Sequence, residues 1–419
     1  MSPRLLRLRL RRSLILIPSL YIVAAMVLGD VIPNLDRSGR FPLRIDVDIP
    51  TAHDILTSTA TGMLAFTGLV VSSMLLVVQF AASQYSPRLV LWFRRDPLVK
   101  HAIGSFLAAS VYPIVALREL NDKAADVPDV TVALSLALVV GASLLFLALL
   151  QRVLDRLRPR NLLGAVLRDG IAAGESIYPR ALGPDTAPPA EDWRRDDPHV
   201  IRMRTHHGVL ASFDRDPLVH AAKDAGVTIE LVPSVGEYLS PGDPLFRVHG
   251  GTIPDRFAAR ALVVSDERTI EQDPAFALRI MVDTAIRALS PAVNDPTTAV
   301  QGIDAIEDLV RALADRDLET SLARDDAGVV RLYWPAPSWD ALLDLAFSEI
   351  RMYGAASIQV TRRMRAALAD LRDATDEIRH PAIDAQREAL DATTMAAHPP
   401  GSRDHELAMG TDRLGLGLA

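Results

Sequence analysis

The chain of 419 residues contains no cysteine, and this absence removes several classes of function. Without cysteine there is no disulfide framework, no thiolate metal site and no cysteine nucleophile. Lysine is scarce as well, because only Lys100, Lys123 and Lys223 occur among 45 Lys and Arg residues. None of the three stands in the Gly-Lys-Ser/Thr triplet of a Walker phosphate loop. Basic chemistry in this protein must therefore come from arginine.

An excess of positive charge is also missing, since 52 Asp and Glu residues give a formal net charge of -7. A nucleic-acid-binding domain normally carries a basic surface, so we expect no nucleic-acid partner. The sequence shows no nucleophile, base and acid at a recognisable catalytic spacing. We therefore expect the protein to be no enzyme and to hold no cofactor.

Asp, Glu, Lys, Arg and His are absent from four apolar runs, which cover residues 13–28, 60–82, 102–117 and 130–150. The second and fourth runs are long enough, at about 1.5 Å per residue, to cross a hydrocarbon layer of roughly 30 Å. The other two need flanking residues such as Arg12 and Lys100 to snorkel toward the headgroups. Four transmembrane helices explain these runs better than buried helices of a soluble protein do.

Basic residues between the runs orient the chain. The N-terminus, the loop after the second run and the segment after the fourth run together hold 13 Lys and Arg residues, whereas the other two loops hold five. The positive-inside rule therefore places both termini in the cytoplasm. The N-terminal arginines would also suit a cleaved signal peptide, so the sequence leaves open whether the first run is removed.

The second run carries small and polar residues at intervals of three, four or seven, a spacing that places them on one helix face. The candidates are Thr61, Gly68, Ser72, Gln79, Ser83 and Ser86. Such a face can let helices pack closely or can line a wet pathway with neutral hydroxyl and amide groups. The sequence does not decide between a pore-lining and a helix-packing role. No charged group lies within the runs, which disfavours a proton-driven transporter but not a passive channel.

After the membrane helices the composition changes several times. We expect a four-pass membrane domain with a helical extension at residues 1–173, followed by a Pro-rich linker at 174–199. Residues 200–269 alternate as a small β-rich unit, and residues 270–393 show helical periodicity. Residues 394–419 look disordered. The expected fold is thus a four-helix α-helical membrane domain, then a mixed α/β cytoplasmic domain with a β-rich unit and a helical bundle.

One turn within the helical region is a candidate ligand pocket. Pro291 ends one helix, while Asp295 and Pro296 have the chemistry of an N-cap and a first helical residue. This pattern has a purely structural explanation, a capped helix-turn-helix. The functional explanation is a small anionic ligand bound at the helix N-terminus. The residues of that pocket would be Arg287, Ser290, Asn294, Asp295, Thr297 and Thr298, and Asp273, Arg279 and Asp283 could extend it as a charged network.

Four histidines fall in or beside the β-rich unit: His206, His207, His220 and His249. A metal site would require these side chains to converge, and their spacing in the sequence does not indicate convergence. We therefore expect no metal.

Two motifs carry a resemblance to a known family. They are Gln84-Tyr85-Ser86-Pro87-Arg88 at the inner end of the second helix and Ala288-Leu289-Ser290-Pro291-Ala292-Val293-Asn294-Asp295-Pro296-Thr297-Thr298-Ala299. The chain resembles the bacterial family called domain of unknown function 2254, from about residue 10 to residue 390. The resemblance implies a multi-pass protein of the bacterial inner membrane. It implies no catalytic residue, because the family has no assigned activity.

Two functions remain open. The favoured hypothesis is a homo-oligomeric, channel-like protein with a cytoplasmic regulatory domain, because four helices are too few to enclose a wide path in one subunit. Anions are mildly favoured by Arg88, Arg94 and Arg95 near the inner mouth. The alternative is a membrane-anchored ligand sensor or scaffold without transport activity.

Overall fold

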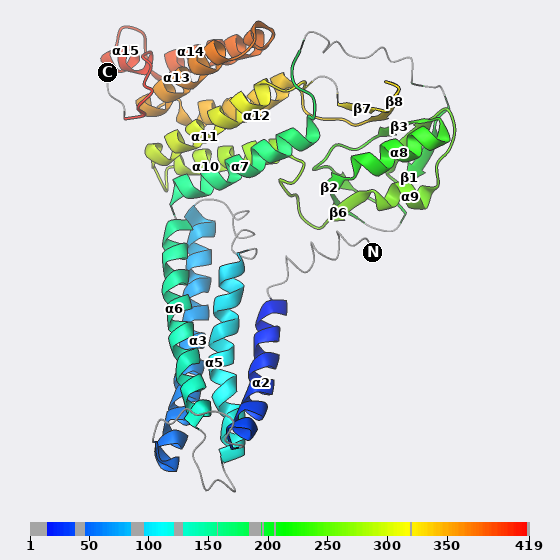
Figure 1. Cartoon of the computed structure of the whole chain (residues 1–419). Coiled ribbons are helices and arrows are strands. Elements are labelled where there is room, and N and C mark those ends of the chain that lie inside the picture. The colour runs from blue at the N-terminus through cyan, green and yellow to red at the C-terminus, as the bar shows by residue number, and fades with distance from the viewer. Residues whose placement is uncertain are drawn as a thin grey trace. The chain divides into compact units, whose positions relative to one another are not determined.

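The computed structural model describes residues 15–37, 47–84, 96–120, 129–156, 158–183, 194, 197–204, 207–318 and 321–416. The chain divides into two compact units, Met1–Arg158 and Pro159–Ala419 (Figure 1). The boundary lies earlier than the expected end of the membrane domain at residue 173. The reason is that the helix of residues Pro159–Ile177 packs on the helices of the second unit.

The first unit consists of four long helices: α2 (Leu16–Arg37), α3 (Ile49–Gln84), α5 (Pro97–Leu120) and α6 (Asp129–Arg156). Each is long and apolar enough to cross a membrane, as the four uncharged runs predict. The helices extend beyond those runs, and Asp48 and Asp96 cap the starts of α3 and α5 by accepting from the amides of Thr51 and Leu98. Of the apolar span of α5, 61% is buried, against 17–22% for the others, so α5 is the central helix.

Close contacts attach α2 and α6 to this central helix. A Cβ at Gly104 of α5 would lie 2.7 Å from the ring of Tyr21, and a Cβ at Gly29 of α2 would lie 3.0 Å from the carbonyl oxygen of Tyr112. Glycine is therefore needed at both crossings of α2 and α5. The hydroxyl of Tyr112 of α5 donates to the carbonyl of Thr131 of α6 at 3.2 Å, and Asp36 of α2 accepts hydrogen bonds from the amides of Val130 and Thr131 at the start of α6.

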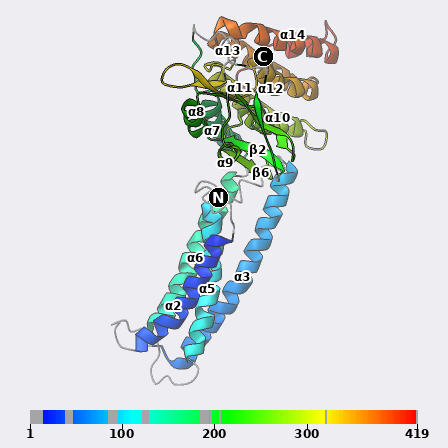
Figure 2. The same ribbon diagram turned by 90° about the vertical axis from the view of Figure 1, so that its right-hand side faces the viewer.

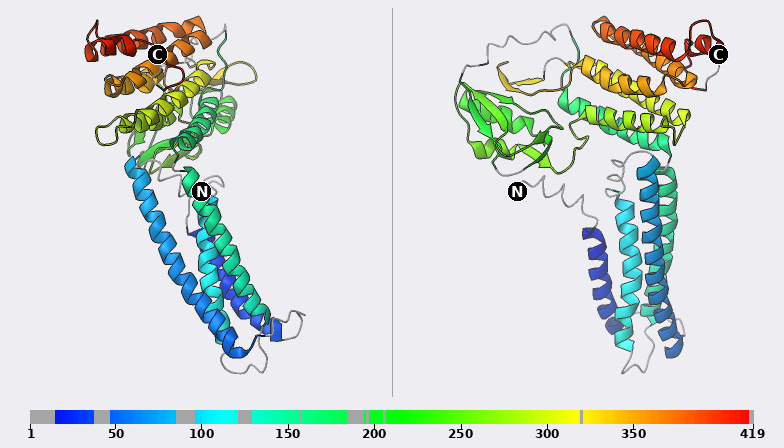
Figure 3. Two further views of the ribbon diagram at one scale, coloured as in Figure 1. Left: turned by 90° about the vertical axis from the view of Figure 1, so that its left-hand side faces the viewer. Right: turned by 180° about the vertical axis from the view of Figure 1, so that it is seen from behind.

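The second unit contains a stack of helices and two small sheets (Figure 1). The helices are α7 (Pro159–Ile177), α10 (Pro274–Ala288), α11 (Pro296–Ala314), α12 (Trp339–Gly354), α13 (Ile358–Ala374), the short 3-10 helix η3 (Glu377–Arg379), α14 (His380–Ala397) and α15 (Arg403–Ala408). Gly170 and Gly174 let α7 approach α10 and α11, because a Cβ at Gly170 would lie 2.8 Å from that of Ala277. Figure 3 shows this stack from two further sides.

The larger sheet has the strand order β1-β5-β3-β8-β7, and the smaller has the order β4-β2-β6. The strands are β1 (His199–Arg202), β2 (Gly208–Phe213), β3 (Thr228–Leu231), β4 (Tyr238–Leu239), β5 (Pro244–His249), β6 (Leu262–Ser265), β7 (Leu322–Arg324) and β8 (Val330–Tyr333). The remaining helices of this region are α8 (Arg215–Ala225) and α9 (Asp255–Arg260). Gly226 ends α8 at φ 67°, a left-handed conformation that favours glycine.

The mixed α/β class is confirmed, but three details of the sequence analysis differ. Strands β7 and β8 come from the region expected to be helical, and β8 pairs in parallel with β3. The helical periodicity expected over residues 270–393 is also interrupted after Gly354, where α12 ends and a Cβ would lie 2.5 Å from the side chain of Val360. Residues 394–416 are ordered as the end of α14, α15 and a final segment, where we expected disorder.

Candidate functional site

The small and polar residues of α3 lie on the surface of the four-helix unit. Thr61, Gly68, Ser72 and Gln79 are all exposed. The side chain of Ser83 and the whole of Ser86 lie outside the described residues. The structure thus brings four of the six candidates onto one outward helix face.

The opposite face of α3 packs on the neighbouring helices. It buries Met63, Thr67 and Val70 and adds Phe66 and Met74 at its edge. The hydroxyl of Thr67 donates a 2.7 Å hydrogen bond to the carbonyl of Met63, so this polar group is satisfied within the helix. Among the described helices of this chain, none packs on the small and polar face.

The four outward residues differ in whether their side chains have a hydrogen-bond partner. Thr61 donates a 2.8 Å bond to the carbonyl of Thr57, which satisfies its hydroxyl. The side chains of Ser72 and Gln79 make no hydrogen bond within the described part of the chain. A Cβ at Gly68 would meet no atom within 4 Å. Ser72 and Gln79 are consequently the groups that most need a polar neighbour.

The C-terminal part of α3 has few neighbours within its own chain. None of residues 71–80 is fully buried, and Leu75, Leu76 and Phe80 are more than half exposed. Figure 2 shows this part of α3 leaning away from α5 and α6, and Figure 3 shows the same divergence from the opposite side. Gln79 lies in this divergent part.

The interior of the four-helix unit is closed by aromatic side chains. Phe66 of α3, Phe106 of α5 and Phe146 of α6 pack with ring centroids 5.0–6.5 Å apart. Phe106 is fully buried. Ala109 and Ala142 join the same cluster. An aqueous path through the middle of a single subunit would have to displace these rings.

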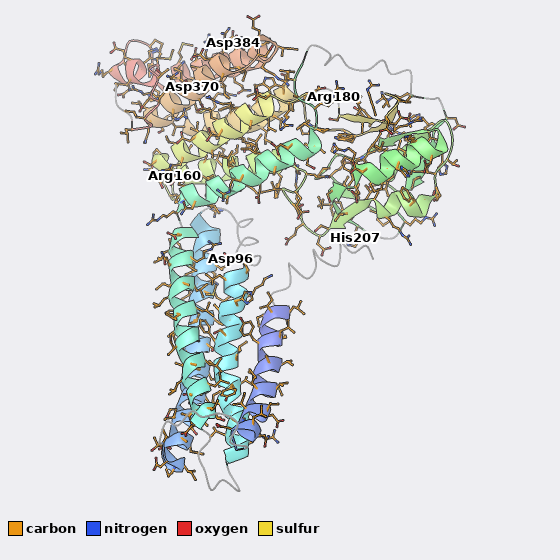
Figure 4. The ribbon with its side chains drawn as sticks, viewed as in Figure 1. Asp96, Arg160, Arg180, His207, Asp370 and Asp384 are labelled. Carbon is orange, nitrogen blue, oxygen red and sulfur yellow. The ribbon has the colours of Figure 1, made fainter. Side chains whose placement is uncertain are left out.

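Charged groups gather where α5 begins and α6 ends. Asp96 accepts from the amide of Leu98 at 2.9 Å and from the guanidinium of Arg152 at 3.1 Å. Figure 4 labels Asp96 at this end of α5. Lys100 is 3% exposed, so it does not reach out toward headgroups as its place beside an apolar run suggested. The sequence did not indicate this burial, because the run begins two residues after Lys100.

The candidate pocket between α10 and α11 forms a capped turn. Asp295 accepts from the amide and the hydroxyl of Thr298 at 3.1 and 2.5 Å, and the hydroxyl of Ser290 donates to the carbonyl of Arg287 at 2.7 Å. Asn294 has a φ of 47°, a left-handed conformation that Asn tolerates better than most residues. The polar groups of this turn are thus largely used in forming it, and Asn294 and Thr297 are exposed.

The charged residues expected to form one network around this turn form two separate clusters. Arg279 bonds to Asp283 at 2.7 Å and to both carboxylate oxygens of Glu349 on α12, and its guanidinium holds the pKa of Glu349 below the usual value. Asp273 instead caps α10 and accepts from Arg268 at 2.5 Å. Burial raises the pKa of Asp273 although Arg268 opposes the shift. Neither group pairs with Arg287, which forms no ion pair within the described ranges.

The histidines do not converge. His206 lies outside the described residues, His207 is exposed and His220 pairs with Asp224 at 3.5 Å. His249 is buried on β5 and lies 3.2 Å from Glu230 on β3. Among the described residues no group of three or more His, Asp or Glu side chains could hold a metal ion.

One cluster around a buried glutamate was missed by the sequence analysis. Glu230 sits directly opposite Arg247 on the next strand and lies within 3.6 Å of His249, Arg247 and Arg194. Arg194 also lies over the ring of Tyr333, 5.8 Å from its centroid. The only signal in the sequence was a glutamate within a strand of apolar residues.

Comparison with known proteins identifies the chain's relatives. Residues 11–370 match the family described as predicted membrane protein, domain of unknown function 2254. Uncharacterized proteins of Mycobacterium tuberculosis and Mycobacterium bovis are 29% identical over 354 residues, which cover 80% of this chain. The match spans 66% of the length of these relatives, slightly less than two thirds. No solved structure is significantly similar.

Proposed function

The chain belongs to the family of predicted membrane proteins called domain of unknown function 2254, and on that premise we propose that it is a homo-oligomeric, channel-like protein. Its conducting path would run between subunits, along the outward face of α3. We place it in the bacterial inner membrane with both termini and the second unit in the cytoplasm, in accordance with the distribution of basic residues. The second unit would regulate the path, and no catalytic step is involved.

The outward position of Ser72 and Gln79 is the observation that carries this proposal. A primary amide facing hydrocarbon without a hydrogen-bond partner is costly, at roughly 2–7 kcal/mol depending on the reference state. Gln79 makes no such bond within the described chain. Water, or a polar group from a second copy, would remove that cost.

The closed interior of the unit supports a path between copies. Phe66, Phe106 and Phe146 fill the space among α3, α5 and α6. A second copy, in contrast, finds open space beside Gly62 and Gly68 on the outside of α3. Small residues at such positions let two helix backbones approach closely. Leu64 and Leu75, which are 58% and 61% exposed, flank the polar positions and suit lipid or a neighbouring helix.

The lining would be neutral, since residues 55–84 of α3 include no Asp, Glu, Lys, Arg or His. Selectivity would then depend on charges at the ends of the path. Arg88, Arg94 and Arg95 follow α3 in the sequence and lie outside the described residues. Their positive charge would concentrate anions, so we propose anions as the favoured ions.

Cysteine accessibility tests the lining directly, because the natural chain has no cysteine to interfere. A cysteine at Ser72 or Gln79 should react quickly with a charged, membrane-impermeant thiol reagent, since thiolates form only in water. Ser143→Cys on the exposed side of α6 is the matched control and should stay unreactive. Equal and slow labelling at all three positions would contradict a water-filled path along α3.

The alternative, a ligand sensor or scaffold, has less geometric support. Of the candidate pocket, Ser290, Asp295 and Thr298 are occupied in shaping the turn. Only Arg287 is left with a guanidinium that pairs with no described residue. A shift in unfolding temperature with small anions that disappears in Arg287→Ala would favour this alternative.

A further inference from the structure

Helices α12 and α13 present a face rich in arginine. Arg362, Arg365 and Arg372 recur on α13 at intervals of three and seven, which places them on one side of the helix. Arg351 of α12 reaches the same covering helix, since its guanidinium donates to Thr393 of α14. We call Arg351, Arg362, Arg365 and Arg372 the arginine face.

The end of the chain covers this face. Asp384 of α14 accepts from Arg372 at 3.0 Å, and Asp391 pairs with Arg365. Figure 1 shows α14 and α15 running along α13, and Figure 4 labels Asp384 on α14. Residues 380–416, the C-terminal cap, are thus held to the face by carboxylates.

Hydrogen bonds between the cap and helices α12 and α13 add to these two ion pairs. Arg351 donates to the hydroxyl of Thr393 at 2.7 Å, and Arg362 donates to the carbonyl of Thr411 at 3.3 Å. Gln359 of α13 donates to the carbonyl of Gly415 at 2.5 Å. The cap therefore contacts the face along its whole length.

Charge complementarity distinguishes the cap from an ordinary packed helix. It contains six Asp and Glu residues and three Arg residues, a net charge of -3 with histidine neutral. The family match ends at residue 370, so the cap lies wholly beyond it. An acidic segment beyond the family match therefore rests on a basic face, of which Arg351, Arg362 and Arg365 lie within the match and Arg372 just after it.

Few apolar contacts hold the cap in place. The four buried residues of α14 are Ile383, Gln386, Leu390 and Thr394, of which two are apolar, whereas α11 buries twelve residues. The Nε atoms of Arg351 and Arg365 are buried beneath the cap without a hydrogen-bond partner among the described atoms. The cap is held mainly by ion pairs, and it leaves the buried Nε–H groups of two arginines without a hydrogen bond. The free energy needed to detach such a segment is lower than that needed to open the core.

We propose that the cap is exchangeable between copies, so that the arginine face of one subunit binds residues 380–416 of a second copy. The same contacts are available to a second copy, because the segment that would dock is identical to the one that occupies the face. Asp384 and Asp391 are seven residues apart, as are Ile383 and Leu390, so a docking helix presents carboxylates and apolar groups along one side. Reciprocal exchange gives a closed, two-fold dimer without any new contact surface.

Cross-linking between full-length copies tests the exchange. One copy carries Arg365→Cys and the other Asp391→Cys, and a short bismaleimide joins the two thiols in detergent solution. We expect a cross-linked heterodimer. The double variant Arg365→Cys/Asp391→Cys, which should cross-link within one chain, shows that the two positions are within reach of the reagent.

The matched control pairs Asp391→Cys with Arg372→Cys, because Arg372 contacts Asp384 and not Asp391. This mixture should give no heterodimer above background. Failure of the matched pair, while the double variant cross-links, would overturn the exchange. Equal cross-linking in the matched and mismatched mixtures would also overturn the exchange, because contact between subunits along α3 would then be enough to explain the cross-links.

A second measurement follows the opening of the cap in the intact chain. Asp384→Asn/Asp391→Asn should raise amide hydrogen exchange across α14 by about tenfold or more, since two charge-assisted bonds are weakened. Glu388→Gln removes the same charge from an exposed position of α14 and should leave the rate unchanged. Equal rates in both variants would show that the ion pairs do not hold the cap.

Discussion

The rings of Phe66 and Phe146 pack edge to face, with centroids 5.0 Å apart and an interplanar angle of 76°. They join α3 to α6 at the same level as Phe106 of the central helix. This contact closes the interior of the four-helix unit, while Thr61, Ser72 and Gln79 lie exposed on the outward face of α3. The proposed path therefore lies outside the subunit that the rings hold together.

A substitution in this aromatic cluster should lower the stability of the protein without changing its ion flux. Phe106→Leu should lower the free energy of unfolding by about 1–2 kcal/mol, less than the roughly 3–5 kcal/mol typical of Phe→Ala. Thermal unfolding in detergent measures this loss. Ion flux through the folded variant should remain unchanged, because the path does not pass the rings. A large rise in flux would instead place the path inside the subunit.

If the α3 helices of two subunits pack closely together, a large side chain at Gly68 should disturb their contact. Gly68→Leu fills the open space beside α3 and should break the contact between α3 helices, so that the oligomer falls to copies joined only through exchanged caps while each subunit stays folded. Size-exclusion chromatography with light scattering measures the oligomeric state. Gly141→Leu on α6 is the control, since a side chain there also meets no described atom within 4 Å. If Gly68→Leu keeps the mass of the wild type, α3 does not form the contact.

The turn before α11 distinguishes a structural role from ligand binding. Asn294 has a left-handed conformation, so Asn294→Gly should be neutral or slightly stabilising, and Asn294→Ala should cost about 1–2 kcal/mol. Thermal unfolding of the two variants gives the comparison. If Asn294→Gly retains stability but loses flux or an anion-dependent shift, the side chain of Asn294 has a role beyond the turn.

The ion pair between α10 and α12 predicts a dependence of stability on pH. The guanidinium of Arg279 holds the pKa of Glu349 below its usual value of 4.5. A carboxyl group with a lowered folded pKa stabilises the fold above its unfolded pKa, and this contribution disappears as the pH falls through the folded pKa. The wild type should therefore lose stability between about pH 5 and pH 3.

Glu349→Gln should lose less stability over this interval, because the amide does not titrate. Asp340→Asn is the control, since Asp340 is exposed on the same helix and pairs with no described residue. Unfolding temperatures measured across the pH range give both curves. Parallel curves for the wild type and Glu349→Gln would show that the pair with Arg279 adds no pH dependence.

Much of the fold follows from local patterns in the sequence. The uncharged runs predicted all four membrane helices, and Asp295 with Pro296 predicted the start of α11. Strands β7 and β8 were missed because β8 is stabilised by parallel pairing with the distant β3, which short-range periodicity cannot reveal. The order of residues 394–416 was missed for a similar reason, since Arg362 and Gln359 of α13 donate hydrogen bonds to the carbonyls of Thr411 and Gly415.

The candidate sites depended even more on long-range packing. The spacing of Thr61, Gly68, Ser72 and Gln79 predicted a shared face, but whether it turns inward or outward depends on the apolar side that α5 and α6 select. The turn at Ser290 was recognised, yet its hydrogen bonds show that the polar groups serve the fold. Glu230 gained its partners only when β3 and β5 paired.

Ion flux from liposomes that contain the purified protein tests the central claim most directly. The comparison is between the wild type, Ser72→Leu/Gln79→Leu and the control Ser143→Leu on the exposed side of α6. The account predicts flux through the wild type and the control, and a loss of flux in the double variant with its oligomeric state preserved. Undiminished flux in the double variant, or no flux from the oligomeric wild type over a range of potentials, would contradict a path along α3.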